Sequence, residues 1–169
     1  MIKKWSNSYK DKVIEPSELA NKVSELRQSG CTIVTLNGSF DLLHAGHLHM
    51  IYEAAQLGHV LIAALNTDSS IRQYKSVHRP IIPLEYRLQM MAALAFVSYV
   101  TWFDEVDPRT ILGIIKPDIH VNGAEYGLNC IESDTVCANG GKVHIVSLVP
   151  GLSTSEIVKT ISNLPSEGR

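Results

Sequence analysis

Short apolar runs rich in β-branched residues alternate with segments of helical periodicity along the whole chain, and this order most constrains its fold. "CTIVTLN" (31–37) and "HVLIAALN" (59–66) have the composition of buried strands. Between them, "AGHLHMIYEAAQLG" (45–58) has helical spacing and a closing glycine. Further strands are predicted at 97–103, 118–123 and 142–149, and further helices at 16–30, 84–96, 108–116, near 131–139 and from about 153.

This alternation, with short connections, predicts right-handed crossovers and a parallel sheet. About five strands make a single open, doubly wound sheet of the Rossmann-like α/β class with helices on both faces, and are too few for a closed eight-stranded barrel. No linker or repeat divides the 169 residues, so we expect one domain over 16–165, preceded by a weakly ordered arm at 1–15. Ligands of such sheets bind beyond the carboxyl ends of the strands.

Charge and cysteine content argue against several classes of function. The net charge is −2 and there is no block of lysine or arginine, so nucleic acid is not an expected partner. The longest apolar run, at 90–97, is far too short to span a bilayer, so no membrane partner is expected. The three cysteines form no CxxC pair and their odd number suits reduced thiols, so we expect a cytoplasmic protein.

Polar residues follow the first predicted strand in the stretch "NGSFDLLHAGH". His44 and His47 stand three positions apart at the start of a predicted helix, so both rings lie on one face and can point at one ligand. Gly46 between them leaves room for a nucleotide to approach the backbone. Neutral imidazoles and the free N–H groups of a helix N-terminus suit phosphate, so the stretch predicts phosphate chemistry at this edge.

Other interpretations of these histidines remain open. His44 and His47 could be structural imidazoles of a helix cap. A zinc site would need His44, His47 and His49 to reach one ion from a single helix; their spacing disfavours this, so no protein-bound metal is expected. His49 lies two residues beyond the pair, and we expect it to pack rather than to bind.

The stretch "GSFDLLHAGH" resembles the nucleotide-binding signature of the HxGH nucleotidylyltransferase superfamily. From about residue 30 to 160 the sequence is most similar to one branch, the bacterial D-glycero-D-manno-heptose-1-phosphate adenylyltransferases, which are free-standing or fused to a sugar kinase. The resemblance is carried, in order, by "NGSFDLLHAGHLHMI", "ALNTDSSIRQYK", "RPIIPLEYRLQMMAAL", "PDIHVNGAEY" and "PGLSTSEIV".

The resemblance implies an enzyme that joins ATP and a heptose 1-phosphate into ADP-heptose, a precursor of lipopolysaccharide, and pyrophosphate. The sugar phosphate attacks the α-phosphorus in line, without a covalent enzyme intermediate, and Mg²⁺ accompanies ATP. The resemblance implies that the catalytic residues are His44, His47 and Lys75. The residues it assigns to nucleotide or substrate binding are Asn37, Gly38, Ser39, Phe40, Gly46, Asn66, Asp68, Arg79, Asn122, Gly123, Glu125, Ser153, Thr154 and Ser155.

Some polar residues also have simpler explanations. Asn66 and Asp68 follow the second predicted strand and could serve turn chemistry, and the same holds for Asp41. Arg87, at the start of a predicted helix, could reach a phosphate or pair with Glu85.

One segment departs from the pattern of the family. Where the family usually carries "KGGDY", this chain has "NGAEY", so Asn122 and Glu125 replace a lysine and an aspartate. Two alternatives therefore stay open: a transferase of the same fold that uses ATP or CTP with another acceptor, such as glycerol 3-phosphate, and a non-catalytic nucleotide-binding relative. The protein partners that we expect are a second copy of the chain, in a homodimer, and a separate sugar kinase that acts upstream.

Overall fold

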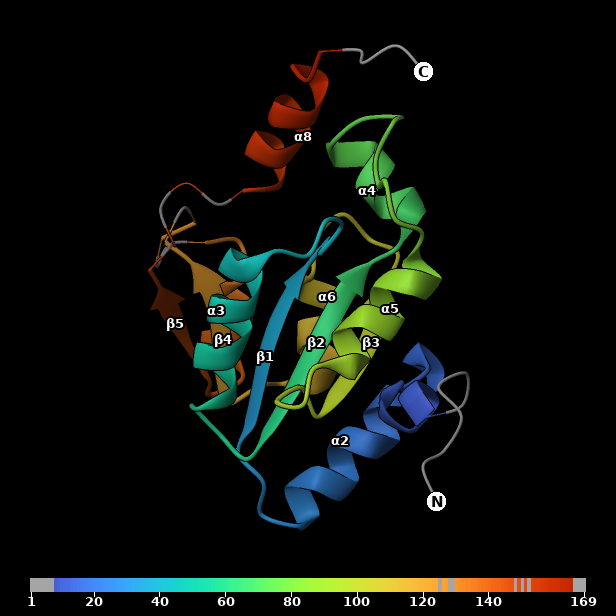
Figure 1. Ribbon diagram of the computed structural model, residues 1–169. Helices are drawn as coiled ribbons and strands as arrows, with labels where there is room; N and C mark the ends of the chain where they lie inside the picture. Colours follow the sequence, from blue (N-terminus) through green and yellow to red (C-terminus); the bar gives the residue numbers. More distant parts are fainter. Residues whose placement is uncertain are drawn as a thin grey trace.

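Five parallel strands form one sheet in the order β3-β2-β1-β4-β5 (Figure 1). The computed structural model describes residues 8–124, 126–127, 130–147, 149, 151 and 153–165. The predicted class, an open doubly wound parallel α/β sheet, is confirmed. The strands are β1 (Ile33–Gly38), β2 (Val60–Asn66), β3 (Tyr99–Phe103), β4 (Ile119–Gly123) and β5 (Lys142–Val146).

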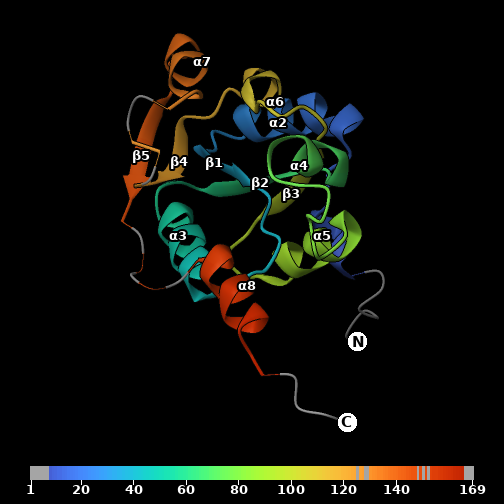
Figure 2. The same ribbon diagram turned by 90° about the horizontal axis from the view of Figure 1, so that it is seen from above.

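Helices cover both faces of the sheet, as Figure 2 shows from above. On one face lie α3 (Ala45–Ala55) and α5 (Leu84–Ala93), and on the other lie α2 (Leu19–Gln28), α6 (Arg109–Ile115) and α7 (Ser133–Ala138). Because both faces are covered, every residue of β2 is buried, which explains its uninterrupted apolar run.

Alternate residues of β1 face the two layers. Val34 and Leu36 join the core under α3 and α5, whereas Ile33 joins the core under α2 and α6. This alternation follows from the two-residue period of a strand. Asn37 and Gly38, the last two residues of β1, lie at the carboxyl edge of the sheet and are the first of the predicted ligand-binding residues.

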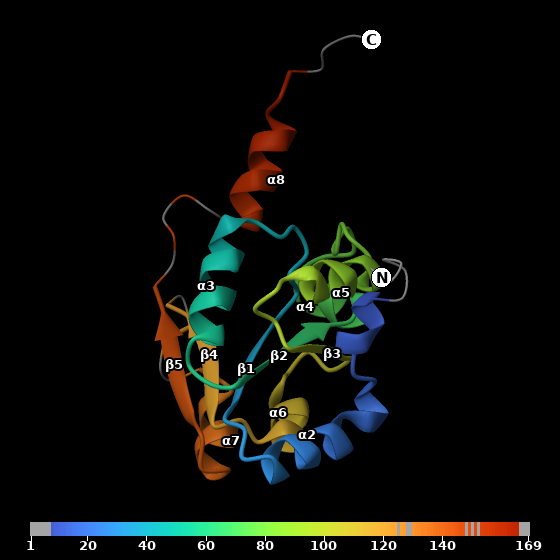
Figure 3. The same cartoon turned by 60° about the horizontal axis from the view of Figure 1, so that its bottom comes forward.

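Two helices lie beyond the carboxyl ends of the strands: α4 (Asp68–Tyr74) and α8 (Thr154–Ser162) (Figures 1 and 3). Sequence periodicity did not predict α4, because seven residues complete only two turns and leave too short a pattern. Its start is nevertheless well defined, since the Thr67 hydroxyl accepts a hydrogen bond from the backbone N–H of Ser70. Within the described ranges, no helix is both long and apolar enough to cross a bilayer.

The prediction of a weakly ordered arm is wrong for residues 8–14. They begin with the helical turn η1 (Tyr9–Lys12), and the backbone N–H of Ile14 donates to the carbonyl of Val100 at 2.8 Å. Ile14 is buried in the core under α2, and burial of this side chain holds the segment against β3. A second turn, η2 (Pro16–Glu18), leads into α2. Residues 1–7 lie outside the described part of the chain.

Candidate active site

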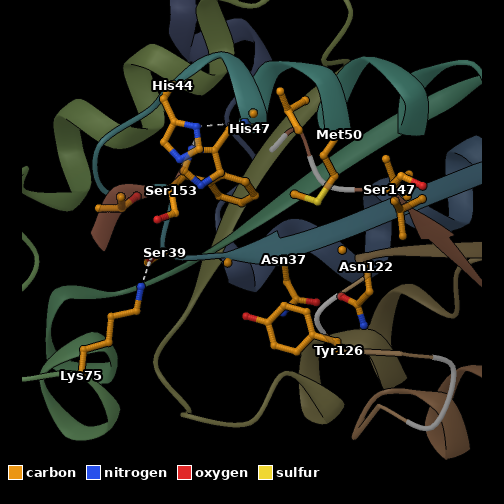
Figure 4. Close-up of a pocket in the computed structure, with 18 residues that line it drawn as sticks. Asn37, Ser39, His44, His47, Met50, Lys75, Asn122, Tyr126, Ser147 and Ser153 are labelled. Carbon is orange, nitrogen blue, oxygen red and sulfur yellow. Dashed lines mark hydrogen bonds between the residues drawn. The ribbon is translucent and has the colours of Figure 1, made fainter. Parts of the chain in front are cut away.

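A cavity of about 380 Å³ opens at the carboxyl ends of β1 and β4, beside the start of α3 (Figure 4). Its volume falls in the range of about 300–1,000 Å³ that is usual for small-molecule sites. The predicted site residues that line it are Asn37, Gly38, Ser39, Phe40, His44, Gly46, His47, Lys75, Asn122, Gly123, Ser153 and Thr154. Residues from the ends of β1 and β4, the start of α3, the end of α4 and the start of α8 therefore meet at one place, as the topology of a parallel sheet predicts.

His44 is the N-cap of α3, and the hydrogen bond that it makes there determines which of its ring nitrogens carries the proton. Its Nδ1 accepts a hydrogen bond from the backbone N–H of His47 at 3.4 Å. A neutral imidazole that accepts at Nδ1 carries its proton on Nε2. Burial lowers the pKa of His44, which favours this neutral form. His44 thus combines a capping role with a free N–H donor at the cavity wall.

The ring of His47 stacks on that of His44, with 3.9 Å between the ring centroids. Burial, followed by the nearby charges of His44 and Lys75, lowers the pKa of His47 to about 4. The ring is therefore neutral at physiological pH. Its Nδ1 is buried and has no hydrogen-bond partner among the described residues, so a ligand is the natural partner for this edge of the ring.

Phe40 supports His47 from a strained backbone position. Its φ of 44° lies in the left-handed region, which a bulky side chain rarely adopts. The Phe40 ring is buried and meets the His47 ring edge-on at 5.5 Å between centroids. A Cβ at Gly38 would stand only 3.3 Å from the same ring, so the absence of a side chain there lets the Phe40 ring pack under the cavity.

Lys75 approaches the cavity from the end of α4, away from the histidine pair (Figure 4). Its Nζ donates to the hydroxyl of Ser39 at 2.9 Å. Burial lowers the pKa of Lys75, and the positive charge of Arg79 acts in the same direction. Two neutral imidazoles and one partly buried ammonium around a single cavity form a suitable environment for a polyphosphate.

Arg87 connects the loops that follow β1 and β2. Its guanidinium is fully buried and donates to the carbonyls of Ser39 (2.7 Å) and Asn66 (2.9 Å), and to the carboxylate of Asp68 (2.7 Å). Both expectations for this residue, a phosphate contact or a pair with Glu85, are wrong. The physical reason is geometric: the side chain points inward and satisfies the carbonyls of two loops that line or flank the site.

Asp41 is an anchor for the segment between α4 and α5. Its buried carboxylate accepts from Arg79 Nε at 2.6 Å and from the backbone N–H groups of Ile81 and Ile82. Burial alone would raise the pKa of Asp41, but the two backbone donors and the guanidinium outweigh it and lower the pKa. The turn-forming role considered for Asp41 from sequence is thus replaced by a contact with a distant segment.

Some predicted binding residues do not line the cavity: Asn66, Asp68, Arg79 and Ser155. The Asn66 amide donates to the Ser70 hydroxyl at 3.0 Å, and Asp68 is bound to Arg87, so both residues stabilise the structure around the site. Their assignment to ligand binding stays a prediction. Glu125 lies outside the described residues.

Sequence reasoning missed part of the cavity wall: Met50, Val121, Val146, Ser147 and Val149. Tyr126, in the stretch "NGAEY" that follows the fourth predicted strand, lines the cavity as well. A signal for Met50 was present, because it follows His47 by three residues and so shares its face of α3. The prediction that His49 packs is wrong. Its side chain is exposed, since the helix turns that position toward solvent.

Residues 35–160 match the model of the family described as cytidylyltransferase-like. The chain belongs to this family. The predictions of the superfamily and of a nucleotidyltransferase are therefore confirmed at the level of the family.

Curated relatives of this cytidylyltransferase-like chain include two proteins named bifunctional protein HldE. The one from Marinomonas sp. (strain MWYL1) is 37% identical over 148 residues, which are 87% of this chain and 31% of that protein. The one from Alkalilimnicola ehrlichii is 39% identical over 154 residues, 90% of this chain and 32% of that protein. The chain thus spans about a third of the length of these relatives.

Solved structures show the same fold as the cytidylyltransferase-like domain. The lipopolysaccharide core biosynthesis protein from Thermoplasma volcanium superposes with a TM-score of 0.58 at 29% identity, over 71% of this chain and 98% of that one. A pantoate-beta-alanine ligase from Francisella tularensis has a TM-score of 0.60 at 16% identity, over 91% of this chain and 73% of that one. The second likeness is one of fold alone.

The buried histidines of the domain predict an acid-sensitive stability. Burial lowers the pKa values of His47 and His120 from 6.5 to about 4. Between pH 6.5 and 4 the unfolded chain binds protons that the folded chain does not, so the free energy of unfolding should fall as the pH drops through this window. The fully buried His120 alone accounts for on the order of 3 kcal/mol of this loss.

This pH dependence can be measured by urea denaturation at a series of pH values. His120→Asn should flatten the curve between pH 6.5 and 4, because its titration is removed. His49→Asn, at an exposed position, is the matched control and should leave the slope unchanged. A curve for His120→Asn as steep as that of the wild type would contradict the assignment.

Proposed function

We propose that this domain transfers the adenylyl group of ATP to a heptose 1-phosphate, forming ADP-heptose and pyrophosphate. The observation that carries the proposal is the arrangement of the cavity, with His44 and His47 on one wall and Lys75 approaching from another element. The similarity to proteins named HldE and to a lipopolysaccharide core biosynthesis protein supports a sugar-nucleotide product.

In this reaction a phosphate oxygen of the sugar phosphate attacks the α-phosphorus of ATP in line. The new P–O bond forms as the bond to the pyrophosphate oxygen breaks, and pyrophosphate leaves with the electron pair. The chain contributes positioning and electrostatic stabilisation. The N–H groups of His44 and His47 donate to phosphate oxygens, and the Lys75 ammonium balances the charge of the departing pyrophosphate.

The N-terminus of α8 adds a further set of donors to the cavity. The Ser153 hydroxyl caps the helix by accepting from the backbone N–H of Glu156 at 3.1 Å, and Thr154 lines the cavity. The cap leaves other N–H groups of the first turn free for a phosphate, so the capping role and the predicted binding role of this segment are compatible.

Magnesium is proposed as a companion of the triphosphate. None of the described residues that line the cavity carries a carboxylate, and Asp41 and Asp68 are already bound to arginines. The described residues do not by themselves form a magnesium site. Phosphate oxygens and water would hold the ion, a mode that Mg²⁺ commonly adopts with nucleotides.

The test is magnesium-dependent release of pyrophosphate from ATP and from CTP, each with heptose 1-phosphate or glycerol 3-phosphate. We expect ATP with heptose 1-phosphate to exceed the other pairs by about tenfold or more in kcat/KM. The highest rate with CTP and glycerol 3-phosphate would replace the proposal with the alternative that the family description keeps open. Nucleotide binding without turnover of any pair would favour a non-catalytic relative.

The partners of the domain follow from the proposed reaction. A sugar kinase is the class of enzyme that would supply a sugar phosphate, either as a separate protein or as another part of a longer chain, since the HldE relatives are about three times longer than the matched region. A homodimer and a cytoplasmic location stay predictions, to be tested by light scattering and by fractionation.

A further inference from the structure

A buried polar cluster lies beneath the cavity on the α7 side of the sheet, and the proposed reaction does not account for it. It contains His120 and Asn122 of β4, and Glu132, the residue that precedes α7. These side chains are 0%, 5% and 5% exposed. Burying a carboxylate is costly unless it is well paired, so Glu132 needs a physical explanation.

Glu132 determines the direction in which the amide of Asn122 points. Asn122 Nδ2 donates to Glu132 Oε2 at 3.4 Å. A carboxylate only accepts hydrogen bonds, so it must meet the NH₂ end of the amide. The Oδ1 of Asn122 therefore points away from the Glu132 carboxylate. The His120 ring interacts with this amide, and because an amide oxygen has two lone pairs, one acceptor position remains for the cavity that Asn122 lines.

Asn37 offers a second amide oxygen at the same edge of the sheet. β1 and β4 are paired neighbours with Leu36 beside Val121, and Asn37 and Asn122 each follow one member of that pair. Both line the cavity, and Figure 4 shows their side chains next to one another. The Oδ1 of Asn37 is buried and lacks a hydrogen-bond partner within the described ranges.

The other members of the cluster do not replace this role of Glu132. His120 Nδ1 shares a hydrogen bond with the Thr35 hydroxyl at 2.8 Å, and burial keeps this ring neutral, although the charge of Glu132 opposes the effect. Cys130, close to both Asn122 and Glu132, has its thiol pKa raised by burial. The Cys130 thiol is a second hydrogen-bond partner of the Glu132 carboxylate, whereas the Asn122 amide is the partner of Glu132 that also lines the cavity.

We propose that Glu132 is a positioning residue, which holds Asn122 so that its amide oxygen and that of Asn37 together accept hydrogen bonds from the nucleoside part of the nucleotide. The inference rests on the proposed function, because it concerns the same cavity. Two amide oxygens that accept hydrogen bonds favour a ligand group that carries N–H or O–H bonds. The exocyclic amine of adenine or a ribose hydroxyl has this chemistry.

Calorimetric titration with magnesium and ATP, ITP or 2′-deoxy-ATP tests the proposal and separates the two sources. ITP lacks the amine and 2′-deoxy-ATP lacks a hydroxyl. We expect the wild type to bind one analogue about tenfold more weakly than ATP, as expected for a lost hydrogen bond to buried acceptors. Glu132→Leu should weaken ATP binding and bring this ratio close to one, while leaving the affinity for the discriminated analogue nearly unchanged.

Glu132→Gln is the conservative rescue, because its amide oxygen can still accept from Asn122, and it should restore most of the discrimination. Glu53→Leu removes an exposed carboxylate on α3 and is the matched control. We expect this variant to bind the three nucleotides with the same ratios of affinity as the wild type. If Glu132→Leu does not fold, Asn122→Ala serves instead, because it removes the acceptor itself and should also abolish the discrimination.

The outcomes separate this inference from the proposed function. Equal weakening of all three nucleotides in Glu132→Leu, or a Gln variant that behaves like the Leu variant, would show a merely structural role and overturn the inference. A wild type that binds all three nucleotides equally would overturn it too, while leaving the transfer reaction intact. A wild type that binds none of these three nucleotides would overturn the proposed function itself.

Discussion

Replacing His47 with alanine is expected to lower the rate of pyrophosphate release by about 100- to 1000-fold, the usual effect of removing one donor that stabilises transition-state charge. The ring stands at the cavity wall with its Nδ1 buried and without a partner in the described part of the chain. Because the ring is neutral with a pKa of about 4, its N–H group can donate a hydrogen bond to a phosphate oxygen without adding a positive charge that would bind the product tightly.

The measurement is kcat and KM for ATP in the pyrophosphate assay, together with calorimetric binding of ATP. The loss should fall mainly on kcat if the contact strengthens in the transition state. His49→Ala is the matched control, since it removes the same side chain from the same helix at an exposed position, and its kcat should equal that of the wild type. Near-normal turnover of His47→Ala with normal ATP binding would refute a catalytic role.

Replacing Arg87 with methionine should destabilise the fold by about 3 kcal/mol, because it leaves two carbonyls and the partly buried Asp68 carboxylate without their donor. The variant leaves Asp68 without its cation and removes the donor shared by the carbonyls of Ser39 and Asn66. Methionine keeps much of the volume and the linear shape, so the loss reports on the polar contacts rather than on a cavity.

Urea denaturation at neutral pH measures this change in the free energy of unfolding. Arg109→Met is the control, because Arg109 also pairs with an aspartate, Asp107, but at the surface. The midpoint of that variant should not move, since exposed ion pairs contribute little. Equal midpoints for the two variants would mean that the buried guanidinium is not an important anchor.

The loop containing Ser39 should also lose its alignment, so the residual activity of Arg87→Met should be low even where the protein remains folded.

Much of the fold was predictable because its signals are local. β2 is an uninterrupted apolar run since it is covered on both faces, and α3 and α5 carry helical spacing over ten or eleven residues. The short helix α4 was missed because its two turns are too few for periodicity. The segment around Ile14 was misjudged because its order depends on a contact with β3.

The candidate site was likewise predictable only where the signal is local. The HxGH stretch and the end of β4 were found from sequence, since a residue that directly follows a strand of a parallel sheet must lie at the ligand-binding edge. Arg79, by contrast, lies in a motif that suggested a phosphate contact, which stays a prediction, and the sequence did not indicate that its Nε is bound to Asp41, 38 residues away. A motif places a residue near an edge of the sheet but does not define the partner of its side chain.

The sequence by itself predicted the class of the sheet, which the structure confirms, and placed His44 and His47 at the carboxyl edge of the sheet, because period, strand ends and helix starts are properties of neighbouring residues. The phosphate chemistry of the two histidines stays a prediction. Only the tertiary structure decided that Arg87 joins the segments at the ends of β1 and β2 and that the Asn122 amide meets the Glu132 carboxylate. Arg87 reaches Ser39 across 48 residues of sequence, and a hydrogen bond of that kind depends on the relative placement of separate elements, which no local pattern encodes.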